Sequence, residues 1–314
     1  MTRASLPIIT AADVAGRYTW ADALLAIEDG HQAAQPSLGD TFLTHHANTL
    51  LSRAAWIPGM GAGVKSVMVL ADNAARGLPT VQGAMLLFDD STGAPIAVID
   101  SDLVTYWKTA ADSALGMDRL ARSDAATLVV IGTGVVADSL VKAHTAVRPA
   151  INRVIIAGRR LEAAQALAAG LAGGPMTVEA TSDIAGAVAA ADIVSTATTS
   201  ATPVLKGDWV KPGTHCDLVG AFRKDMREAD DALLTKAKIW VDCRDTTLDH
   251  IGELLIPLQN GTITRGDVAG DFYDLLARPA PPPRDPDAVT VFKNGGGAHL
   301  DVMIARSLLE AVAH

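Results

Sequence analysis

A glycine-rich turn in the middle of the chain has the residue types that bind the pyrophosphate of a dinucleotide. It reads Gly132-Thr133-Gly134-Val135-Val136-Ala137 and follows the β-branched segment Thr127–Ile131. Gly132 permits a tight strand-to-helix turn, Gly134 lets backbone approach the phosphates, and Ala137 lets helix and strand pack closely. The N-terminus of the next helix then offers free N–H groups. A glycine turn that binds nothing is the alternative, but the complete strand–turn–helix–strand unit favours a dinucleotide site.

Two arginines bear on which dinucleotide would bind. Sheets that select NAD usually carry an acidic residue about 20 positions beyond the glycines, where it binds ribose hydroxyls. Here the next strand ends in Ala157-Gly158-Arg159-Arg160, and no acid precedes Glu162. Arginines can bind a 2′-phosphate instead, so Arg159 and Arg160 predict that NADP(H) is preferred and NAD(H) tolerated. An ordinary solvated start of a helix is the alternative.

A third group of cofactor contacts is expected after a later strand. Thr196-Ala197-Thr198-Thr199 follows the apolar segment that begins at Asp192. In sheets of this kind that place meets the nicotinamide ribose, so Thr196 and Thr198 are predicted cofactor-binding residues. Generic loop chemistry explains the same pattern.

From Ala125 onward, the order of predicted strands and helices indicates an α/β fold with a Rossmann-type, doubly wound parallel sheet. Strands alternate with helices, and the strands are apolar enough to be covered on both faces. The predicted strands are Thr127–Ile131, Arg153–Ala157, Met176–Ala180, Asp192–Thr196, Thr214–Val219, Lys238–Asp242 and Val289–Phe292. The predicted helices between the early strands are Val135–Thr145, Leu161–Leu171 and Asp183–Ala190.

The first hundred residues predict a separate α+β domain. A capping box at Thr19–Asp22 opens a helix over Trp20–Gln32. Strands are expected at Gly63–Leu70, Gly83–Phe88 and Pro95–Ile99, the last two as a hairpin around Asp89–Gly93. A helix over Thr105–Leu120 follows, and a stiff connector at Pro279–Pro286 precedes a last helix, Leu300–Val312, which is expected to pack back on the N-terminal domain. The domains are then 1–118 with about 297–314, and 119–296, an α/β dinucleotide-binding domain.

Composition excludes several classes of protein. The 314 residues hold 26 Lys and Arg against 35 Asp and Glu, so a net charge of −9 argues against nucleic-acid and membrane-surface partners. With 49% hydrophobic residues the chain is not disordered. Cys216 and Cys243 give no disulfide framework and are expected in buried strands. The eight histidines form no ligand motif, so no metal is expected. The N-terminus shows no export signal and no run is long enough to span a bilayer, which predicts a cytoplasmic protein.

Ordered motifs along nearly the whole chain resemble the ornithine cyclodeaminase/μ-crystallin family. They are Gly63-Val64-Lys65-Ser66-Val67, Asn73–Thr80, Phe88–Ala97, Thr105–Ala111, the Gly132 turn, Val219-Gly220-Ala221 and Val291-Phe292-Lys293. That family includes cyclodeaminases, alanine dehydrogenases, reductases of imines such as pyrroline-2-carboxylate, and a thyroid-hormone-binding crystallin. The resemblance implies that the N-terminal domain is the substrate-binding and dimerisation domain. In the homodimer these domains would pair through β-structure, with an active site that faces the nicotinamide.

The resemblance also implies substrate-site residues. Lys65 would lie beside the substrate, while Thr80 and the residue at position 108 would hold its carboxylate. A lysine that faces inward from an apolar strand is costly without a purpose. If buried, Lys65 would have a lowered pKa and act as proton donor or carboxylate partner. A strand lysine that faces solvent is the alternative. Asp301 is expected either near the cofactor or as a helix cap.

Three departures from the family pattern bear on function. Position 108 is usually Arg, and Lys108 keeps the charge but loses the bidentate fork. A second carboxylate-binding Arg is missing, because no Lys or Arg stands between Arg17 and Arg53. His45, His46 or Arg53 could replace it, although an ordinary surface or core histidine is the alternative. The acid that cyclodeaminases carry after Val219-Gly220-Ala221 is replaced by Phe222.

The missing acid favours a reductase. Cyclodeamination needs several timed proton transfers, which a positioned carboxylate can supply, whereas reduction of a preformed imine needs one proton and one hydride. The predicted function is therefore NAD(P)H-dependent reduction of small carboxylated imines, reversible as an amino-acid dehydrogenase. The alternatives are an ornithine cyclodeaminase, which makes proline and ammonia from ornithine, and a non-catalytic NADP-dependent ligand-binding protein of the crystallin type.

Overall fold

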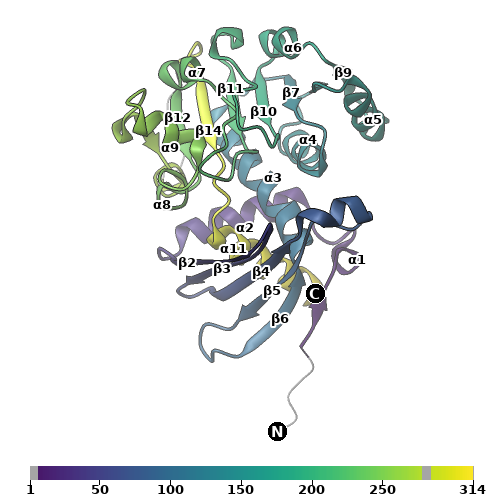
Figure 1. Cartoon of the computed structure of the whole chain (residues 1–314), viewed down its shortest axis with the longest axis vertical. Helices are drawn as coiled ribbons and strands as arrows, with labels where there is room; N and C mark the ends of the chain where they lie inside the picture. Colours follow the sequence, from purple (N-terminus) through teal and green to yellow (C-terminus); the bar gives the residue numbers. More distant parts are fainter. Residues whose placement is uncertain (1–5, 278–283, 314) are drawn as a thin grey trace. The chain divides into compact units, whose positions relative to one another are not determined.

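The chain divides into two units that are each described by themselves. The computed structural model describes residues 6–277 and 284–313 (Figure 1). Unit 1 is Met1–Lys108 with Gly297–His314, and unit 2 is Thr109–Gly296. The division falls inside α3 (Ser101–Leu120). Of the predicted connector at Pro279–Pro286, residues 279–283 lie outside the described residues.

Unit 2 is built on an eight-stranded parallel sheet, which confirms the predicted α/β, doubly wound fold class. The strand order is β13-β12-β14-β11-β10-β7-β8-β9. The strands are β7 (Thr127–Ile131), β8 (Arg153–Ala157), β9 (Thr177–Thr181), β10 (Ile193–Thr196), β11 (His215–Leu218), β12 (Lys238–Val241), β13 (Val268–Gly270) and β14 (Thr290–Lys293). β8 and β9 lie on one side of β7, and β10 and the later strands lie on the other, so the strand order reverses at β7.

Both faces of this sheet are covered by helices, because alternate strand residues enter two separate cores (Figure 1). Leu128 and Val130 pack with α3, α4 (Val135–Val147) and α5 (Leu161–Leu171). Val129 and Ile131 pack on the other side with α6 (Ile184–Ala190), α7 (Asp231–Lys236) and α9 (Gly252–Gln259). The remaining helical segments of the unit are η2 (Gly207–Trp209), α8 (Arg244–Thr247), η3 (Arg265–Asp267) and α10 (Phe272–Leu276).

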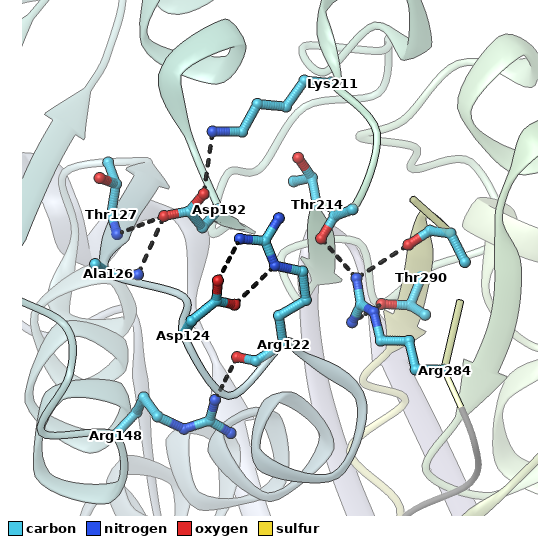
Figure 2. Close-up of polar contacts among 12 residues, drawn as sticks. Arg122, Asp124, Ala126, Thr127, Arg148, Asp192, Lys211, Thr214, Arg284 and Thr290 are labelled. Atoms are coloured by element: carbon cyan, nitrogen blue, oxygen red, sulfur yellow. Dashed lines mark hydrogen bonds and ion pairs between the residues drawn. The ribbon is translucent and has the colours of Figure 1, made fainter. Parts of the chain in front are cut away.

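Polar contacts join the strands at the N-terminal edge of this sheet (Figure 2). Asp192, just before β10, accepts hydrogen bonds from the backbone N–H groups of Ala126 and Thr127, each at 3.1 Å, and pairs with Lys211 at 3.0 Å. Arg284 donates to backbone oxygens around the starts of β11 and β14. These side chains satisfy backbone groups at this edge, while the opposite edge carries the glycine turn.

Unit 1 is a six-stranded sheet with helices on one face. The order is β1-β6-β5-β4-β3-β2, antiparallel except for the parallel pair β1–β6. The strands are β1 (Ile8–Ile9), β2 (Ser37–His45), β3 (Asn48–Ile57), β4 (Gly61–Val69), β5 (Val81–Phe88) and β6 (Pro95–Asp100). The helical segments are α1 (Ala11–Val14), α2 (Trp20–Gln32), η1 (Ala71–Arg76) and α11 (Ala298–Ala313). Residues such as Ala55, Ile57 and Val67 face the helices and are buried.

Several local predictions for unit 1 are confirmed. Thr19 and Asp22 form the expected capping box of α2. β5 and β6 pair as the expected hairpin, in which Asp89 accepts from the backbone N–H of Thr92 and Gly93 has φ of 67°. The last helix packs against α2 and the sheet, as expected.

Other features were not predicted, or were placed wrongly. The hairpin β2–β3 has no counterpart in the predicted segments, because its two-residue turn uses His46 at φ 53° where glycine or asparagine is the usual signal. α3 begins at Ser101, four residues before the predicted start at Thr105. Cys216 is a buried strand residue as expected, but Cys243 is buried at the N-cap of α8, one residue beyond Asp242. Among the described residues, no helix is long and apolar enough to cross a membrane.

Candidate functional site

A cavity of about 650 Å³ opens at the C-terminal ends of β7, β8 and β10 in unit 2. This is the point where the order of strands reverses, and open parallel sheets bind their ligands there. The cavity is lined by Ile131, Gly132, Thr133, Gly134, Gly158, Arg159, Arg160, Ile184, Ala197, Thr198, Thr199, Ser200 and Val204. Six of the ten residues predicted to bind cofactor therefore line one cavity.

The glycine turn has the backbone geometry that its sequence predicts. Gly132 has φ of 144°, and a Cβ there would lie 2.5 Å from the backbone oxygen of Ala197, so this position requires glycine. Gly134 is the N-cap of α4, and a Cβ there would meet no atom within 4 Å, which leaves the backbone open to a ligand. This open cradle, with the N-terminus of a 13-residue helix, suits a pyrophosphate.

The rest of the predicted turn does not line the cavity. Ala137 is fully buried in the core between α4 and the sheet, as close packing requires. Val135 is 73% exposed, and Val136 is half-buried. Their side chains are absent from the cavity lining, although a phosphate would be bound by backbone N–H groups in any case.

Arg159 and Arg160 are exposed at the end of β8 and both line the cavity. Arg160 is also the N-cap of α5. Two guanidinium groups therefore stand beside the position where the adenosine ribose of a dinucleotide binds in this fold.

The two predicted threonines differ in their exposure to the cavity. Thr198 lines the cavity, whereas Thr196 is fully buried and does not. Both hydroxyls donate to the buried carboxylate of Glu228, each at 2.7 Å. Sequence reasoning did not find Glu228, since it lies some 30 residues further on and no local pattern marks it.

Unit 1 contains a buried cluster of two lysines on one carboxylate. Lys65 from β4 and Lys108 from α3 both reach Oδ1 of Asp301 in α11, at 2.6 and 2.7 Å. Lys65 also donates to Thr105 at 3.3 Å. All three charged side chains are almost completely buried, so Lys65 does not face solvent. Two ammonium groups against one carboxylate leave an excess positive charge, which suits an anionic substrate.

Burial and neighbouring charge set the protonation of this cluster. Burial lowers the pKa of Lys108 to about 7, and the charge on Lys65 acts in the same direction against the attraction of Asp301. Burial alone would raise the pKa of Asp301, but the two lysines outweigh it and lower that pKa below its ordinary value. Asp301 therefore stays ionised while Lys108 titrates near neutral pH.

Asp301 does not act as the helix cap considered from the sequence. It lies in the first turn of α11, with its carboxylate directed to the lysines. Two residues earlier in the helix, His299 is buried with its ring 5.3 Å from that of His31. Burial lowers the pKa of His299 far below its usual value, so it adds no charge to the cluster.

Two predicted substrate residues lie away from this cluster. Thr80 is exposed, and its backbone oxygen accepts from the N–H of Leu70. His45 is exposed at the end of β2. Lys65 on β4 pairs with Arg53 on β3, which pairs with Asp40 on β2, so His45 lies five residues along β2 from the level of Lys65. At about 3.4 Å per strand residue, that offset is roughly 17 Å. Within one chain His45 therefore does not reach Lys65, whereas Arg53 lies beside it and pairs with Asp40 at 3.0 Å.

The described residues contain no group of three or more His, Cys, Asp or Glu side chains that could hold a metal ion.

Comparisons with known proteins agree with this geometry. The chain is 52% identical over 301 residues to the Delta(1)-pyrroline-2-carboxylate reductase of Paracoccus denitrificans, covering 96% of this chain and 95% of the relative. The Thermococcus litoralis Delta(1)-pyrroline-2-carboxylate reductase, solved with NADH and L-proline, superposes with a TM-score of 0.91 at 25% identity over 98% of each chain. An archaeal alanine dehydrogenase dimer with bound NAD has a TM-score of 0.90 at 27% identity and covers 98% and 96% of the two chains.

These similarities confirm the predicted class of activity, an NAD(P)-dependent oxidoreductase that reduces carboxylated imines at C=N. A model of the ornithine cyclodeaminase/mu-crystallin family matches residues 52–314. The chain belongs to the ornithine cyclodeaminase/mu-crystallin family.

Proposed function

We propose that the protein reduces Δ1-pyrroline-2-carboxylate, or a closely similar cyclic imino acid, to the corresponding amino acid. The observation that carries this proposal is the buried Lys65–Asp301–Lys108 cluster with its excess positive charge. A carboxylate is the anionic group that such a cluster binds best, and the reductases to which this chain is similar act on a carboxylated imine.

Each residue of the cluster has a separate role in this proposal. Lys108 binds the substrate carboxylate, and Lys65 supplies the proton that the ring nitrogen gains. Asp301 holds both ammonium groups through Oδ1. Its Oδ2, buried without a hydrogen-bond partner among the described residues, accepts a hydrogen bond from the ring N–H once the nitrogen has gained that proton. A dinucleotide, when bound, supplies the hydride that the C=N carbon receives. Fixed positions for the reacting groups provide much of the rate acceleration.

The site favours reduction over cyclodeamination. Phe222 occupies the place where cyclodeaminases carry an acid, and its ring is 62% exposed beneath the guanidinium of Arg223. Position 222 therefore offers an aromatic ring and not a carboxylate that could time the transfers that release ammonia.

The proposed activity predicts a specific pair of assays. Purified protein should oxidise NAD(P)H in the presence of Δ1-pyrroline-2-carboxylate and should release no ammonia from ornithine. Lys65→Met should lower kcat/KM by about a thousandfold, because a positioned proton donor is lost, while the Kd for NADH stays within about threefold. Tight cofactor binding without turnover across cyclic and linear imino acids would contradict the proposal and favour a ligand-binding protein.

The titration of Lys108 predicts a pH dependence of substrate binding. Lys108 carries its charge below a pKa of about 7 and loses it as the pH rises further. The KM for the imino acid should therefore rise above pH 7, by up to about tenfold per pH unit. Lys108→Arg should remove this rise because arginine stays charged. Lys238→Arg, on an exposed strand lysine, should keep the wild-type profile. An unchanged profile for Lys108→Arg would show that another group titrates.

We propose further that the cofactor site prefers NADP(H) and tolerates NAD(H). Arg159 and Arg160 line the cavity where a ribose 2′-phosphate would lie. Replacing both by alanine should raise the KM for NADPH about 10- to 100-fold and change the KM for NADH by less than about threefold. Arg265→Ala, an exposed arginine of the same unit, should alter neither value. A wild-type enzyme with a clear preference for NADH would overturn this assignment.

The third proposal is a homodimer formed through unit 1. All nine residues of the edge strand β2 are exposed. Leu43, Leu50 and Met68 align across β2, β3 and β4 on the face opposite α11, with Leu43 62% and Met68 40% exposed. Trp56 is on the same face and is 55% exposed. A sheet face with several exposed apolar side chains fits a second copy of the same face.

The dimer proposal predicts the effect of one charge on its interface. Leu43→Glu should yield a species of half the wild-type mass in light scattering after size exclusion, because burying the carboxylate is costly. Leu25→Glu, on a leucine of α2 that is 55% exposed, should keep the wild-type mass. A wild-type protein that runs as a single chain would contradict the proposal.

A further inference from the structure

We propose that Glu228 is a positioning residue that shapes the nicotinamide side of the dinucleotide cavity. The inference rests on the proposed nucleotide binding and adds a residue that touches neither substrate nor cofactor. Glu228 is completely buried and does not line the cavity. It holds the loop Ala197–Ser200, which does line it.

The carboxylate of Glu228 accepts hydrogen bonds from four donors. Oε1 accepts from the backbone N–H and the hydroxyl of Thr198, each at 2.7 Å. Oε2 accepts from the hydroxyl of Thr196 at 2.7 Å and from the backbone N–H of Gly220 at 2.6 Å. Four donors match the acceptor capacity of an ionised carboxylate. One side chain thereby ties the segment after β10 to the segment after β11.

The loop Ala197–Ser200 packs closely against two glycines, so its backbone has little room to move. A Cβ at Gly220 would lie 2.1 Å from the backbone oxygen of Thr198, and a Cβ at Gly132 would lie 2.5 Å from that of Ala197. The loop therefore passes between two glycines without room for a side chain. A small displacement would close or widen the cavity beside the Gly132 turn.

The backbone of Glu228 is fixed by a second buried carboxylate. The backbone N–H groups of Glu228 and Ala229 donate to the buried carboxylate of Glu253 at 2.8 and 2.9 Å. Lys293, also fully buried, donates to three backbone oxygens at the same edge, those of Leu218, Ala221 and Asn294. The acid satisfies N–H groups and the lysine satisfies carbonyls, so the edge keeps its shape without any ligand.

The position of the loop indicates which half of a dinucleotide it serves. Arg159 and Arg160 follow β8, on one side of the Gly132 turn, while the loop held by Glu228 follows β10, on the other side. A dinucleotide lies across the point where the strand order reverses, with its pyrophosphate at the turn. The β8 side binds adenosine, and the β10 side accordingly faces the nicotinamide half.

Glu228→Gln tests this role because it keeps the shape and replaces two acceptor sites by donors. Fluorescence titration should give a Kd for NADH about 10- to 100-fold above wild type, because a buried charged hydrogen-bond set is broken. The Kd for AMP, which fills only the adenosine half, should stay within about threefold. A merely structural residue would weaken both ligands together.

Two further variants keep the test decisive. Thr196→Val removes one donor to Glu228 without touching the cavity, and should raise the Kd for NADH about 3- to 10-fold even if Glu228→Gln fails to fold. Asp217→Asn removes an equally buried carboxylate from β11 and should leave the Kd for NADH within about threefold. An unchanged Kd for NADH in Glu228→Gln, or equal losses for AMP and NADH, would overturn the inference. A wild-type protein that binds NADH but reduces no imine would contradict the proposed activity alone.

Discussion

The attraction of two lysines to one buried carboxylate is the interaction on which the proposed chemistry depends. Asp301 joins a strand, a long helix and the last helix of the chain, although its partner Lys65 is 236 positions away. Burying three charged groups is costly unless each is paired. Here the carboxylate is fully neutralised, but one carboxylate cannot neutralise two ammonium groups, so positive charge remains. Below the Lys108 pKa of about 7, the remaining positive charge makes the cluster complementary to an anion.

Unit 2 uses buried charge in a different way. Glu228 and Lys293 are fully buried at the C-terminal edge of the sheet. Lys293 donates to backbone oxygens, and Glu228 accepts from two backbone N–H groups and two threonine hydroxyls. Strand ends leave N–H and C=O groups unpaired, and such groups must be satisfied when they are buried. An acid and a base share this task, which leaves the glycine turn free to bind phosphate. In unit 1 the buried charge forms the cluster proposed to bind substrate, whereas in unit 2 it fixes backbone that lines the cavity.

Features were predictable from the sequence where the residues that form them lie close together along the chain. The Gly132 turn, the capping box at Thr19 and the β5–β6 hairpin depend on residues within a few positions of each other, and their types report the local geometry. Asp301 and Glu228 depend on contacts that join distant segments, and an isolated acid looks the same in a core as on a surface. The β2–β3 hairpin escaped prediction because its turn residue, His46, adopts a conformation that its type rarely adopts.

The substitution of lysine for arginine at position 108 changes the chemistry of the cluster as well as its geometry. An arginine there would remain charged at any relevant pH and would serve as a permanent carboxylate clamp. Burial, with the charge of Lys65, lowers the pKa of Lys108 to about 7, so this lysine changes its charge near neutrality. A carboxylate that binds between the lysines would raise that pKa again and hold the ammonium in its charged form. Substrate binding and protonation are thus coupled within one cluster. In the proposed reaction the single proton that accompanies the hydride comes from Lys65, so no second acid is needed at Phe222.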